Sequence, residues 1–234
     1  RWTWAENLAW IGNTGPVDPD AAITSHFESL FQSAGHRVNT LQPDLREIGV
    51  AQEMGQFTQG ATTFNASMFT ATFGATGTDS FITGVVYDDV DGDGFYSIGE
   101  GRGGVSLATR DRDTATAAAG GYALAVLPAA AVDVTLAGAV GSITVTVDLS
   151  GGNAKLDLVD GAVVQASADL QLGAGATDAR LLGAADLFLT GNAANNRLQG
   201  GHGDDTIDGG AGHDMVILSG SMSDYTIAEG QGQV

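Results

Sequence analysis

The first third of the chain combines a helical pattern with a strand pattern. Four apolar residues with the spacing i, i+4, i+7 and i+8 define one face of an amphipathic helix: Ile23, Phe27, Leu30 and Phe31. The acidic stretch that begins at Asp18 provides a start for this helix, and Gly35 provides a stop. Residues 67–73 are rich in Thr and Phe, which predicts a strand. Residues 1–78 therefore have an α+β pattern.

This segment also holds the aromatic residues on which its packing would depend. All three Trp of the chain, Trp2, Trp4 and Trp10, and six of its nine Phe lie there. Two interpretations of the Trp cluster are open: the rings pack into the core, or they line a sugar-binding cleft. Core packing is the interpretation that we favour, and it predicts an aromatic core.

The rest of the chain shows no helical period. Three alternating segments predict β-strands: 81–87, 132–136 and 143–149. Glycine-rich turns separate them, so residues 79–161 have the pattern of a β-sandwich. Residues 162–190 are a β-rich segment with a short repeated Asp-Leu theme. Residues 191–234 comprise a nine-residue repeat and the start of one further strand, which an alternating pattern near residue 225 predicts.

The nine-residue repeat has a specific form, G-G-x-G-x-D-x-U-x, in which U is a large apolar residue. It fits residues 200–208 and 209–217 without a gap, and a degenerate copy occupies 191–199. In such a repeat six residues form a tight glycine turn, and glycine tolerates the positive φ angles that the turn requires. The turn carbonyls and the Asp carboxylate are hard oxygen donors that suit Ca²⁺. The sequence predicts the following calcium ligands here: Asn196, Gly200, Gly201, Gly203, Asp205, Gly209, Gly210, Gly212 and Asp214.

A flexible Gly-Asp linker is the alternative interpretation of this repeat. It does not account for Leu198, Ile207 and Val216, which recur at intervals of nine residues and would turn into a core. The repeats resemble the RTX family, the calcium-binding β-roll repeats of bacterial proteins exported by type I secretion. That resemblance implies a parallel β-roll whose ions are shared between repeats i and i+2. Asn196 and Asp214 would then lie on one side of the roll and Asp205 on the other.

A second calcium motif lies in the middle segment. Residues 89–100 match D-x-[DN]-x-[DN]-G-x₅-E at every specified position. The ligand offsets of that motif assign six residues: Asp89, Asp91, Asp93, the Phe95 carbonyl, Ser97 and a bidentate Glu100. Because the flanks read as strands, a helix–loop–helix hand is not expected. A solvated acidic loop without an ion is the alternative interpretation.

The surroundings of this loop resemble the B-type repeat domains of serine-aspartate adhesins. The resemblance covers about residues 79–160 and includes the glycines near Gly101 and Gly121. It implies a calcium-loaded β-sandwich that acts as a spacer in a surface protein. We find no His, Cys or paired base and nucleophile in this segment.

The first segment resembles the CAP superfamily, to which the cysteine-rich secretory proteins belong. Glu6, in Glu6-Asn7, corresponds to the Glu of the G-E-N motif, and His36, in Gly35-His36-Arg37, to the His of the G-H-R motif. The resemblance implies the C-terminal part of an α-β-α sandwich in which two His and two Glu hold a divalent ion such as Zn²⁺. Glu6 and His36 are therefore candidate catalytic residues, and the other two positions would precede Arg1.

Other interpretations of the histidines are open. His36 also fits a histidine at a helix C-terminus, stabilised by the helix dipole, and Glu6 fits a surface acid. His26 is expected to be structural. His202 and His213 occupy variable positions of the nonapeptides and are expected to face solvent.

The charge and composition of the chain narrow the range of possible binding partners. The chain has 234 residues, a net charge of −19, 35 Gly and no Cys. An acidic surface excludes nucleic acid as a partner, and no apolar run approaches the ~20 residues of a spanning helix. Since the sequence begins at Arg1 and ends within an alternating pattern, we expect a fragment of a longer protein.

The sequence as a whole predicts a mainly β, multi-domain bacterial protein that is secreted, with calcium ions as its principal partners. Its β-roll and β-sandwich would fold around Ca²⁺ outside the cell, and its CAP segment would contact an extracellular or cell-surface ligand. A metal-dependent hydrolase that acts through the CAP cleft of the full-length parent is the alternative function.

Overall fold

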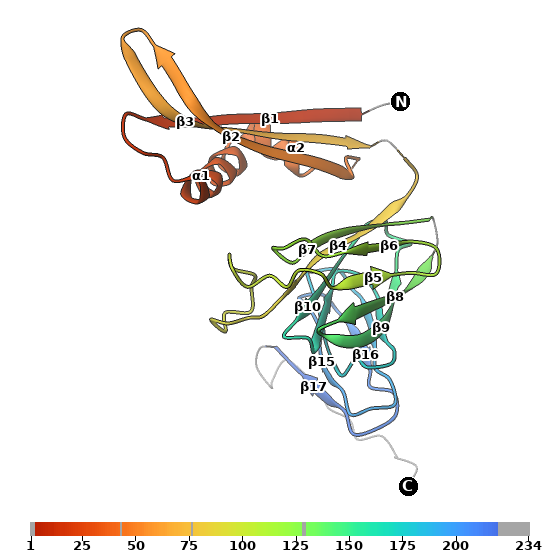
Figure 1. Cartoon of the computed structure of the whole chain (residues 1–234). Coiled ribbons are helices and arrows are strands. Elements are labelled where there is room, and N and C mark those ends of the chain that lie inside the picture. Colours follow the sequence, from red (N-terminus) through yellow and green to blue (C-terminus); the bar gives the residue numbers. More distant parts are fainter. Residues whose placement is uncertain (1–2, 43, 76, 128–129, 220–234) are drawn as a thin grey trace. The chain divides into compact units, whose positions relative to one another are not determined.

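A computed structural model describes residues 3–42, 44–75, 77–127 and 130–219 (Figure 1). The chain divides into two compact units, Arg1–Thr78 and Asp79–Val234. No helix within the described residues is long and apolar enough to cross a membrane. The strand predicted near residue 225 and the side chain of Trp2 lie outside the described residues.

The first unit is a three-stranded antiparallel sheet with two helices. Its elements are β1 (Thr3–Asn13), α1 (Pro19–Gln32), α2 (Ala34–Thr40), β2 (Glu47–Gln59) and β3 (Thr62–Ala75). The strand order is β1-β3-β2. The strand predicted at residues 67–73 lies within β3 and is confirmed. Leu30 of α1 packs with Phe69, Ala71 and Phe73 of β3 in the core of this unit.

The helix predicted after Asp18 is present, but the predicted buried face is partly wrong. Asp18 caps α1, and its carboxylate accepts a hydrogen bond from the Asp20 backbone N–H at 3.0 Å. The buried residues are Ala22, His26 and Leu30, which recur every four residues. His26 is fully buried. Its Nε2 and the Ser67 hydroxyl are hydrogen-bonded at 3.0 Å, which reduces the cost of burying this polar ring. Hydropathy alone does not identify a histidine whose partner lies 41 residues away.

Three predicted core positions of α1 are instead exposed to solvent: Ile23, Phe27 and Phe31. Gly35 does not end the helix either, because α1 ends before Ser33 and Gly35 lies within α2.

The prediction of an aromatic core is likewise only partly correct. Phe69 and Phe73 are buried, whereas Trp4 is 72% exposed and Trp10 is 50% exposed. The two Trp side chains lie on the face of β1 that the helices do not cover, as the alternation of side chains along a strand requires.

The second unit contains all the remaining strands of the described residues. They are β4 (Ser80–Tyr87), β5 (Ser106–Ala108), β6 (Asp113–Ala115), β7 (Gly121–Val126), β8 (Ala131–Gly138), β9 (Gly141–Asp148), β10 (Ala154–Val159), β11 (Val163–Ala166), β12 (Leu170–Leu172), β13 (Asp178–Leu181), β14 (Phe188–Thr190), β15 (Arg197–Gln199), β16 (Thr206–Asp208) and β17 (Met215–Ile217). The strands predicted at 81–87, 132–136 and 143–149 correspond to β4, β8 and β9.

These strands form two seven-stranded sheets among the described residues. The orders are β17-β15-β13-β11-β10-β4-β7 and β16-β14-β12-β9-β8-β5-β6. Both sheets contribute to one hydrophobic core, in which Ile82, Leu156 and Leu198 of the first sheet are buried together with Leu136 and Val145 of the second. The sheets therefore run without interruption from the middle segment of the chain into the repeats.

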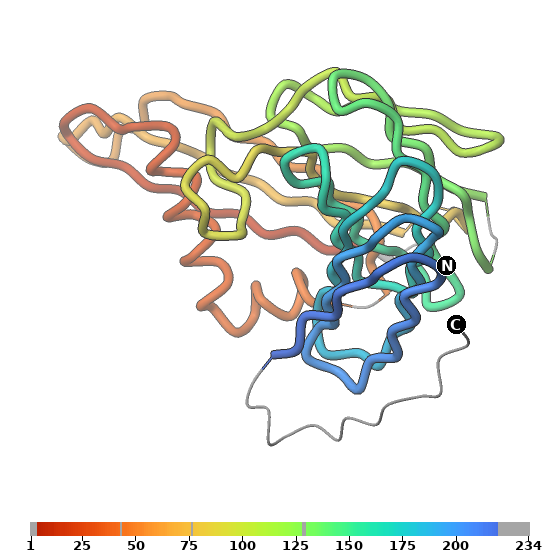
Figure 2. Tube along the Cα trace, turned by 90° about the horizontal axis from the view of Figure 1, so that it is seen from below, coloured from red at the N-terminus to blue at the C-terminus, as the bar shows by residue number. Residues whose placement is uncertain are grey.

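The strands from β11 to β17 form a parallel β-roll. They fall alternately in the two sheets, and Figure 2 shows their stacked turns in blue. Leu189 pairs with Ile207 and Leu198 with Val216, so that these neighbours are 18 residues apart, which is two nonapeptides. The earlier pairs β12–β14 and β13–β15 are offset by 19 residues. Leu198 is fully buried and Ile207 packs against the core, whereas Val216 on β17 is 43% exposed.

Candidate calcium sites

The acidic loop 89–100 emerges from the end of β4. A bridge between Tyr87 and Gly101 closes its neck, and the Asp88 backbone N–H donates to the Glu100 carbonyl at 3.0 Å. Gly92 and Gly94 have φ angles of +74° and +79°, which allow the chain to turn back sharply. The loop is therefore held at its base by strand structure while its tip is exposed.

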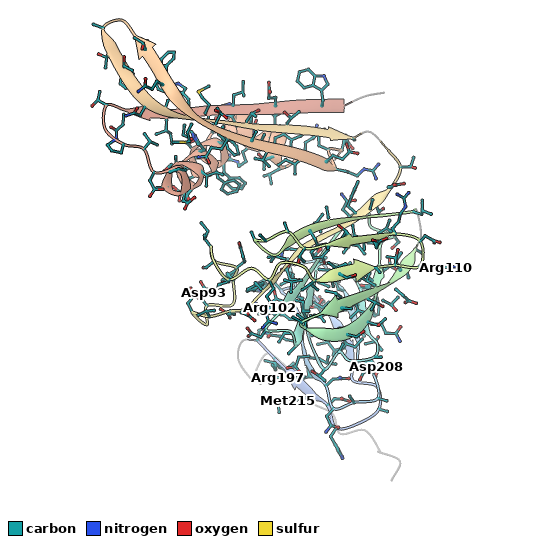
Figure 3. The ribbon with its side chains drawn as sticks, viewed as in Figure 1. Asp93, Arg102, Arg110, Arg197, Asp208 and Met215 are labelled. Carbon is teal, nitrogen blue, oxygen red and sulfur yellow. The ribbon has the colours of Figure 1, made fainter. Side chains whose placement is uncertain are left out.

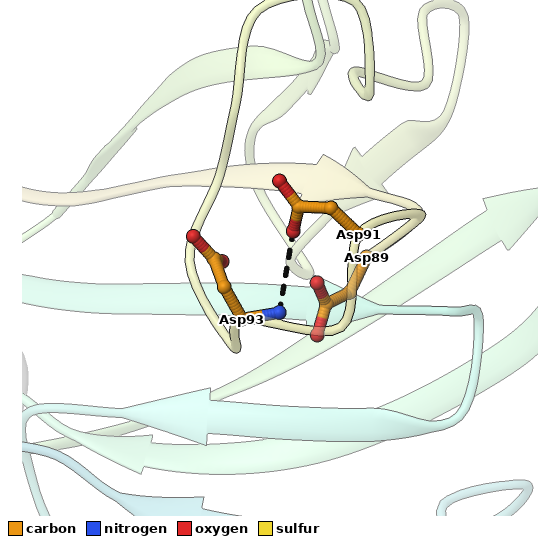
Figure 4. Close-up of side chains that lie close together, drawn as sticks. All are labelled: Asp89, Asp91 and Asp93. Carbon is orange, nitrogen blue, oxygen red and sulfur yellow. Dashed lines mark hydrogen bonds between the residues drawn. The ribbon is translucent and has the colours of Figure 1, made fainter.

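The structure brings together the first three predicted ligands of the loop. One carboxylate oxygen from each of Asp89, Asp91 and Asp93 lies within 4.8 Å of the others (Figure 4). Local hydrogen bonds orient these side chains. Asp91 Oδ1 accepts from the Asp93 N–H at 3.2 Å, and Asp89 Oδ2 accepts from the Gly94 N–H at 3.0 Å. The backbone thus holds three like charges in one place.

One oxygen of this group has no partner. Asp89 Oδ1 is buried and accepts no hydrogen bond, and it is one of three such side-chain atoms in the described residues. A buried polar atom without a partner costs about 1–3 kcal/mol, and more when it is charged. Burial, like charge and an open coordination position all fit a divalent cation, and the oxygen-only donor set fits Ca²⁺.

Glu100 lies at the base of the loop and is 8% exposed. Its Oε1 accepts from the Val90 N–H at 2.9 Å and its Oε2 from the Ser97 N–H at 2.7 Å. The predicted ligand Ser97 is therefore next to Glu100. The Phe95 side chain is 72% exposed, and the Phe95 backbone N–H donates a hydrogen bond to Asp93 Oδ1 at 2.8 Å. Glu100 is not part of the cluster that Asp89, Asp91 and Asp93 form. Each of its carboxylate oxygens accepts one loop N–H and retains one lone-pair position.

Charge around the loop is only partly compensated. Arg102 forms a bidentate pair with Asp88, with contacts of 2.7 Å and 2.5 Å, so that Asp88 is neutralised. Burial raises the pKa of the Tyr87 phenol, and the negative charge of Asp89 adds to that increase. The three clustered carboxylates have no cationic side chain paired with them among the described residues.

Sequence reasoning missed Asp160. Its Oδ1 accepts the Asp89 backbone N–H at 3.0 Å, and it is the one non-glycine residue in the described residues with a positive φ, 54°. The Asp160-Gly161 dipeptide marks a turn in the sequence, but nothing in the sequence places that turn beside a loop 71 residues earlier.

In the β-roll the predicted carboxylates lie between successive turns. Asp205 Oδ2 accepts from the Gly201 N–H at 2.7 Å within its own glycine turn. Asp205 Oδ1 accepts from the Leu187 N–H at 3.1 Å, in the neighbouring turn of the same stack. Asp214 Oδ1 accepts from the Asn196 N–H at 2.9 Å. Asn196 and Asp214 are thus neighbours, and Asp205 belongs to the other stack of turns.

The glycines of the repeats are required mainly because the turns approach one another closely. A Cβ on Gly203 would clash with the Ala185 carbonyl, and one on Gly201 would lie 2.7 Å from the Gly183 carbonyl oxygen. The predicted reason, a positive φ, holds for Gly210 and Gly212. For Gly200, Gly201, Gly203 and Gly209 it is wrong, and the space that the neighbouring turn or the Asp side chain occupies is the reason instead.

Further polar side chains connect the turns and were not identified from the sequence. Asp169 Oδ1 accepts from the Phe188 N–H at 2.8 Å, and Asp186 Oδ1 accepts from the Asp204 N–H at 2.9 Å. Asn192 donates to the Gly173 carbonyl at 2.7 Å. The repeated Asp-Leu theme of residues 162–190 is the signal that could have found Asp169 and Asp186. The period of the clear repeats could not, because neighbouring strands in this part of the roll are offset by 19 residues. His202 and His213 are exposed, as predicted.

In the first unit the structure does not bring Glu6 and His36 together. Asn7, which is 1% exposed, donates to the His36 carbonyl at 2.9 Å, so α2 lies on the Asn7 side of β1. Glu6 extends from the opposite face, where it accepts from the Thr70 hydroxyl at 3.4 Å. His36 Nδ1 is hydrogen-bonded to the Ser33 hydroxyl at 2.8 Å. Two ligands on opposite faces do not fit a zinc site, which needs three or four.

The comparisons with known proteins agree with the geometry of the roll. Residues 188–216 match the family model of the RTX calcium-binding nonapeptide repeat, a model that describes four copies of the repeat. The chain therefore carries calcium-binding repeats of the RTX type in the form of a β-solenoid. No curated protein and no solved structure matches the chain.

Proposed function

We propose that this chain is part of a secreted calcium-binding protein whose second unit is stabilised by Ca²⁺ at two kinds of site. The single observation that carries the loop site is the convergence of Asp89, Asp91 and Asp93 around a buried, unpartnered Asp89 oxygen. Asp89, Asp91, Asp93 and Glu100 would hold the ion through carboxylates, with the Phe95 carbonyl and Ser97 completing the set. The bound cation would offset the repulsion among these carboxylates.

The second kind of site lies in the β-roll. The match to RTX repeats supports Ca²⁺ between turns, with Asp205 on one side and Asn196 and Asp214 on the other as the side-chain ligands. The carbonyls of the glycine turns that begin at Gly200 and Gly209 would supply the remaining oxygens. Extracellular calcium modules have Kd values of ~10⁻⁴–10⁻³ M, so these sites would fill outside a cell and stay empty in the cytosol. Export by type I secretion belongs to this proposal.

The adhesin-like sandwich and the CAP segment belong to the same proposal. The loop joins β4 to strands that share one core, which supports a rigid calcium-loaded spacer over residues 79–161.

In the first unit, the hydrogen bond from Asn7 to the His36 carbonyl joins the two segments that carry the CAP resemblance. This supports a recognition fold for an extracellular ligand. No observation favours the hydrolase alternative, because the Glu6 side chain and the helix α2 that carries His36 lie on opposite sides of β1.

Thermal unfolding of the full chain tests the proposal, with circular dichroism as the readout. We expect a higher melting temperature in calcium than in chelator, because an ion that binds only the folded state adds about 2.7 kcal/mol at a hundred times its Kd. Asp89→Asn removes a loop ligand, and Asp205→Asn with Asp214→Asn removes roll ligands, so each change should reduce the calcium-dependent increase. Asp111→Asn, an exposed acid outside both sites, is the charge-matched control. Equal melting temperatures in calcium and chelator would contradict the proposal.

A further inference from the structure

A cleft of about 270 Å³ lies between the calcium loop and the outer face of the β-roll. Asp89, Gly94 and Asp160 line it on one side, and residues of β11, β13, β15 and β17 line it on the other. Its volume is just below the ~300–1,000 Å³ of sites for drug-sized ligands, so it suits a small molecule or the end of a chain.

Two of the three buried side-chain atoms without a hydrogen-bond partner in the described residues belong to residues that line this cleft. One is the acceptor Asp89 Oδ1, which the calcium proposal explains. The other is the donor Arg180 Nε. Calcium cannot satisfy an N–H group, so the Arg180 side of the cleft offers a donor to a different, negatively polarised group.

The sheet arranges further donors around Arg180. Gln165, Arg180 and Gln199 are paired across three neighbouring strands, so their side chains point from the same face. Two residues along these strands, Arg197 of β15 lies opposite Asp178 of β13 in the backbone register. Neither arginine forms an ion pair with a carboxylate within the described residues, although the chain has 28 acids and only nine Lys and Arg. Figure 3 shows Arg197 on the same side of the unit as Asp93.

We propose that this cleft binds the carboxylate group of a small ligand or of a peptide C-terminus. The planar guanidinium of Arg180 offers a fork of N–H donors that matches a carboxylate, with the amide of Gln165, which is 8% exposed, and the side chain of Arg197 beside it. The inference rests on the proposed function in one respect. Asp89 and Asp160 face the cleft, so a calcium ion in the loop reduces the negative field that the incoming anion meets.

Nitrogen-15 NMR of the arginine side chains in the full chain tests this inference. The calcium-saturated protein is titrated with sodium succinate and, separately, with N-acetylglycine, at constant ionic strength. We expect a saturable shift of the Arg180 Nε–H signal with at least one probe. Saturation with succinate identifies a free dicarboxylate as the source, and saturation with N-acetylglycine identifies a chain end.

Three variants make the test specific, with backbone amide shifts of Gln199 as their readout. Arg180→Gln should weaken binding at least tenfold, and Arg180→Lys, which keeps the charge but lacks the fork, should weaken it severalfold. Arg110→Gln, which removes the same charge from the opposite side of the unit in Figure 3, should leave binding unchanged.

The outcomes separate the two proposals. If the full chain shows no saturable binding of calcium before either anion is added, the proposed function is overturned. Calcium binding followed by a linear, non-saturating response to both probes overturns this inference. An equal loss of binding in the Arg110 and Arg180 variants also overturns it, because the anion would then respond to net charge alone.

Discussion

The loop and the roll turns present the same residue types to an ion in different ways. In loop 89–100 three carboxylates from one short segment converge, and one Asp89 oxygen is left without a partner. In the roll the two regular nonapeptides each contribute one predicted carboxylate ligand and the degenerate copy contributes the Asn196 amide, while Asp205 already accepts two backbone N–H groups. The loop is preorganised by its own hydrogen bonds. The roll, by contrast, is held by contacts between turns.

This difference has a consequence for stability without calcium. If the loop holds Ca²⁺ as proposed, removal of the ion leaves like charges close together, so the loss of stability there is electrostatic and local. In the roll, stacking of turns depends on buried apolar residues and on glycines that permit close approach. Changes to packing should therefore damage the roll more than changes to a single roll carboxylate.

The largest effect is expected from Leu198→Ala. Leu198 is fully buried between the sheets, and truncation of a buried Leu costs about 2–5 kcal/mol. Its partner in the parallel ladder, Val216, is 43% exposed, so Val216→Ala should cost about 1 kcal/mol or less. Urea unfolding in calcium measures both. Equal losses would show that the described roll is not packed as the structure has it.

Gly203→Ala should have the next largest effect. The new methyl group would meet the Ala185 carbonyl of the preceding turn, and overpacking of this kind costs about 1–3 kcal/mol. Gly151→Ala is the matched control, since a Cβ there has no heavy atom within 4 Å. Chemical denaturation with and without calcium separates the two variants. If Gly203→Ala is as stable as Gly151→Ala, close approach of the turns is not what requires glycine.

The smallest expected change is the loss of stability of the first unit as the pH falls. We use this unit as a reference that does not depend on calcium. Burial lowers the pKa of His26 below its ordinary 6.5, and a hydrogen bond to Ser67 opposes that shift. As the pH falls through about 6.5 the unfolded chain gains a proton that the folded unit excludes. The stability of this unit is therefore complete above pH ~6.5 and falls as the pH drops toward the folded pKa.

Proton NMR of the full chain from pH 8 to 5 measures this titration. We expect the His26 ring to titrate below its ordinary pKa of 6.5, in calcium and in chelator alike. A His26 pKa at or above 6.5 would contradict the buried, neutral assignment.

Much of the fold follows from local patterns in the sequence. The strands at 81–87, 132–136 and 143–149 and the nine-residue phase of Leu198 and Ile207 depend on alternation and period, which are local properties. The contacts that the sequence did not reveal are long-range. His26 is buried because Ser67 lies beside it, and Asp160 supports Asp89 across 71 residues.

The candidate site divides in the same way. Asp89, Asp91 and Asp93 could be named because their spacing within one loop brings them together. The cleft that contains Arg180 could not, because its walls come from residues that only the pairing of β11, β13 and β15 makes neighbours.

Calorimetric titration of Ca²⁺ into the metal-stripped full chain tests the central claim most directly. We predict saturable binding with more than one class of site, and loss of one class in the Asp89→Asn variant. No heat of binding in the wild-type chain at millimolar calcium, confirmed at a second temperature, would contradict calcium as the ion that this unit holds.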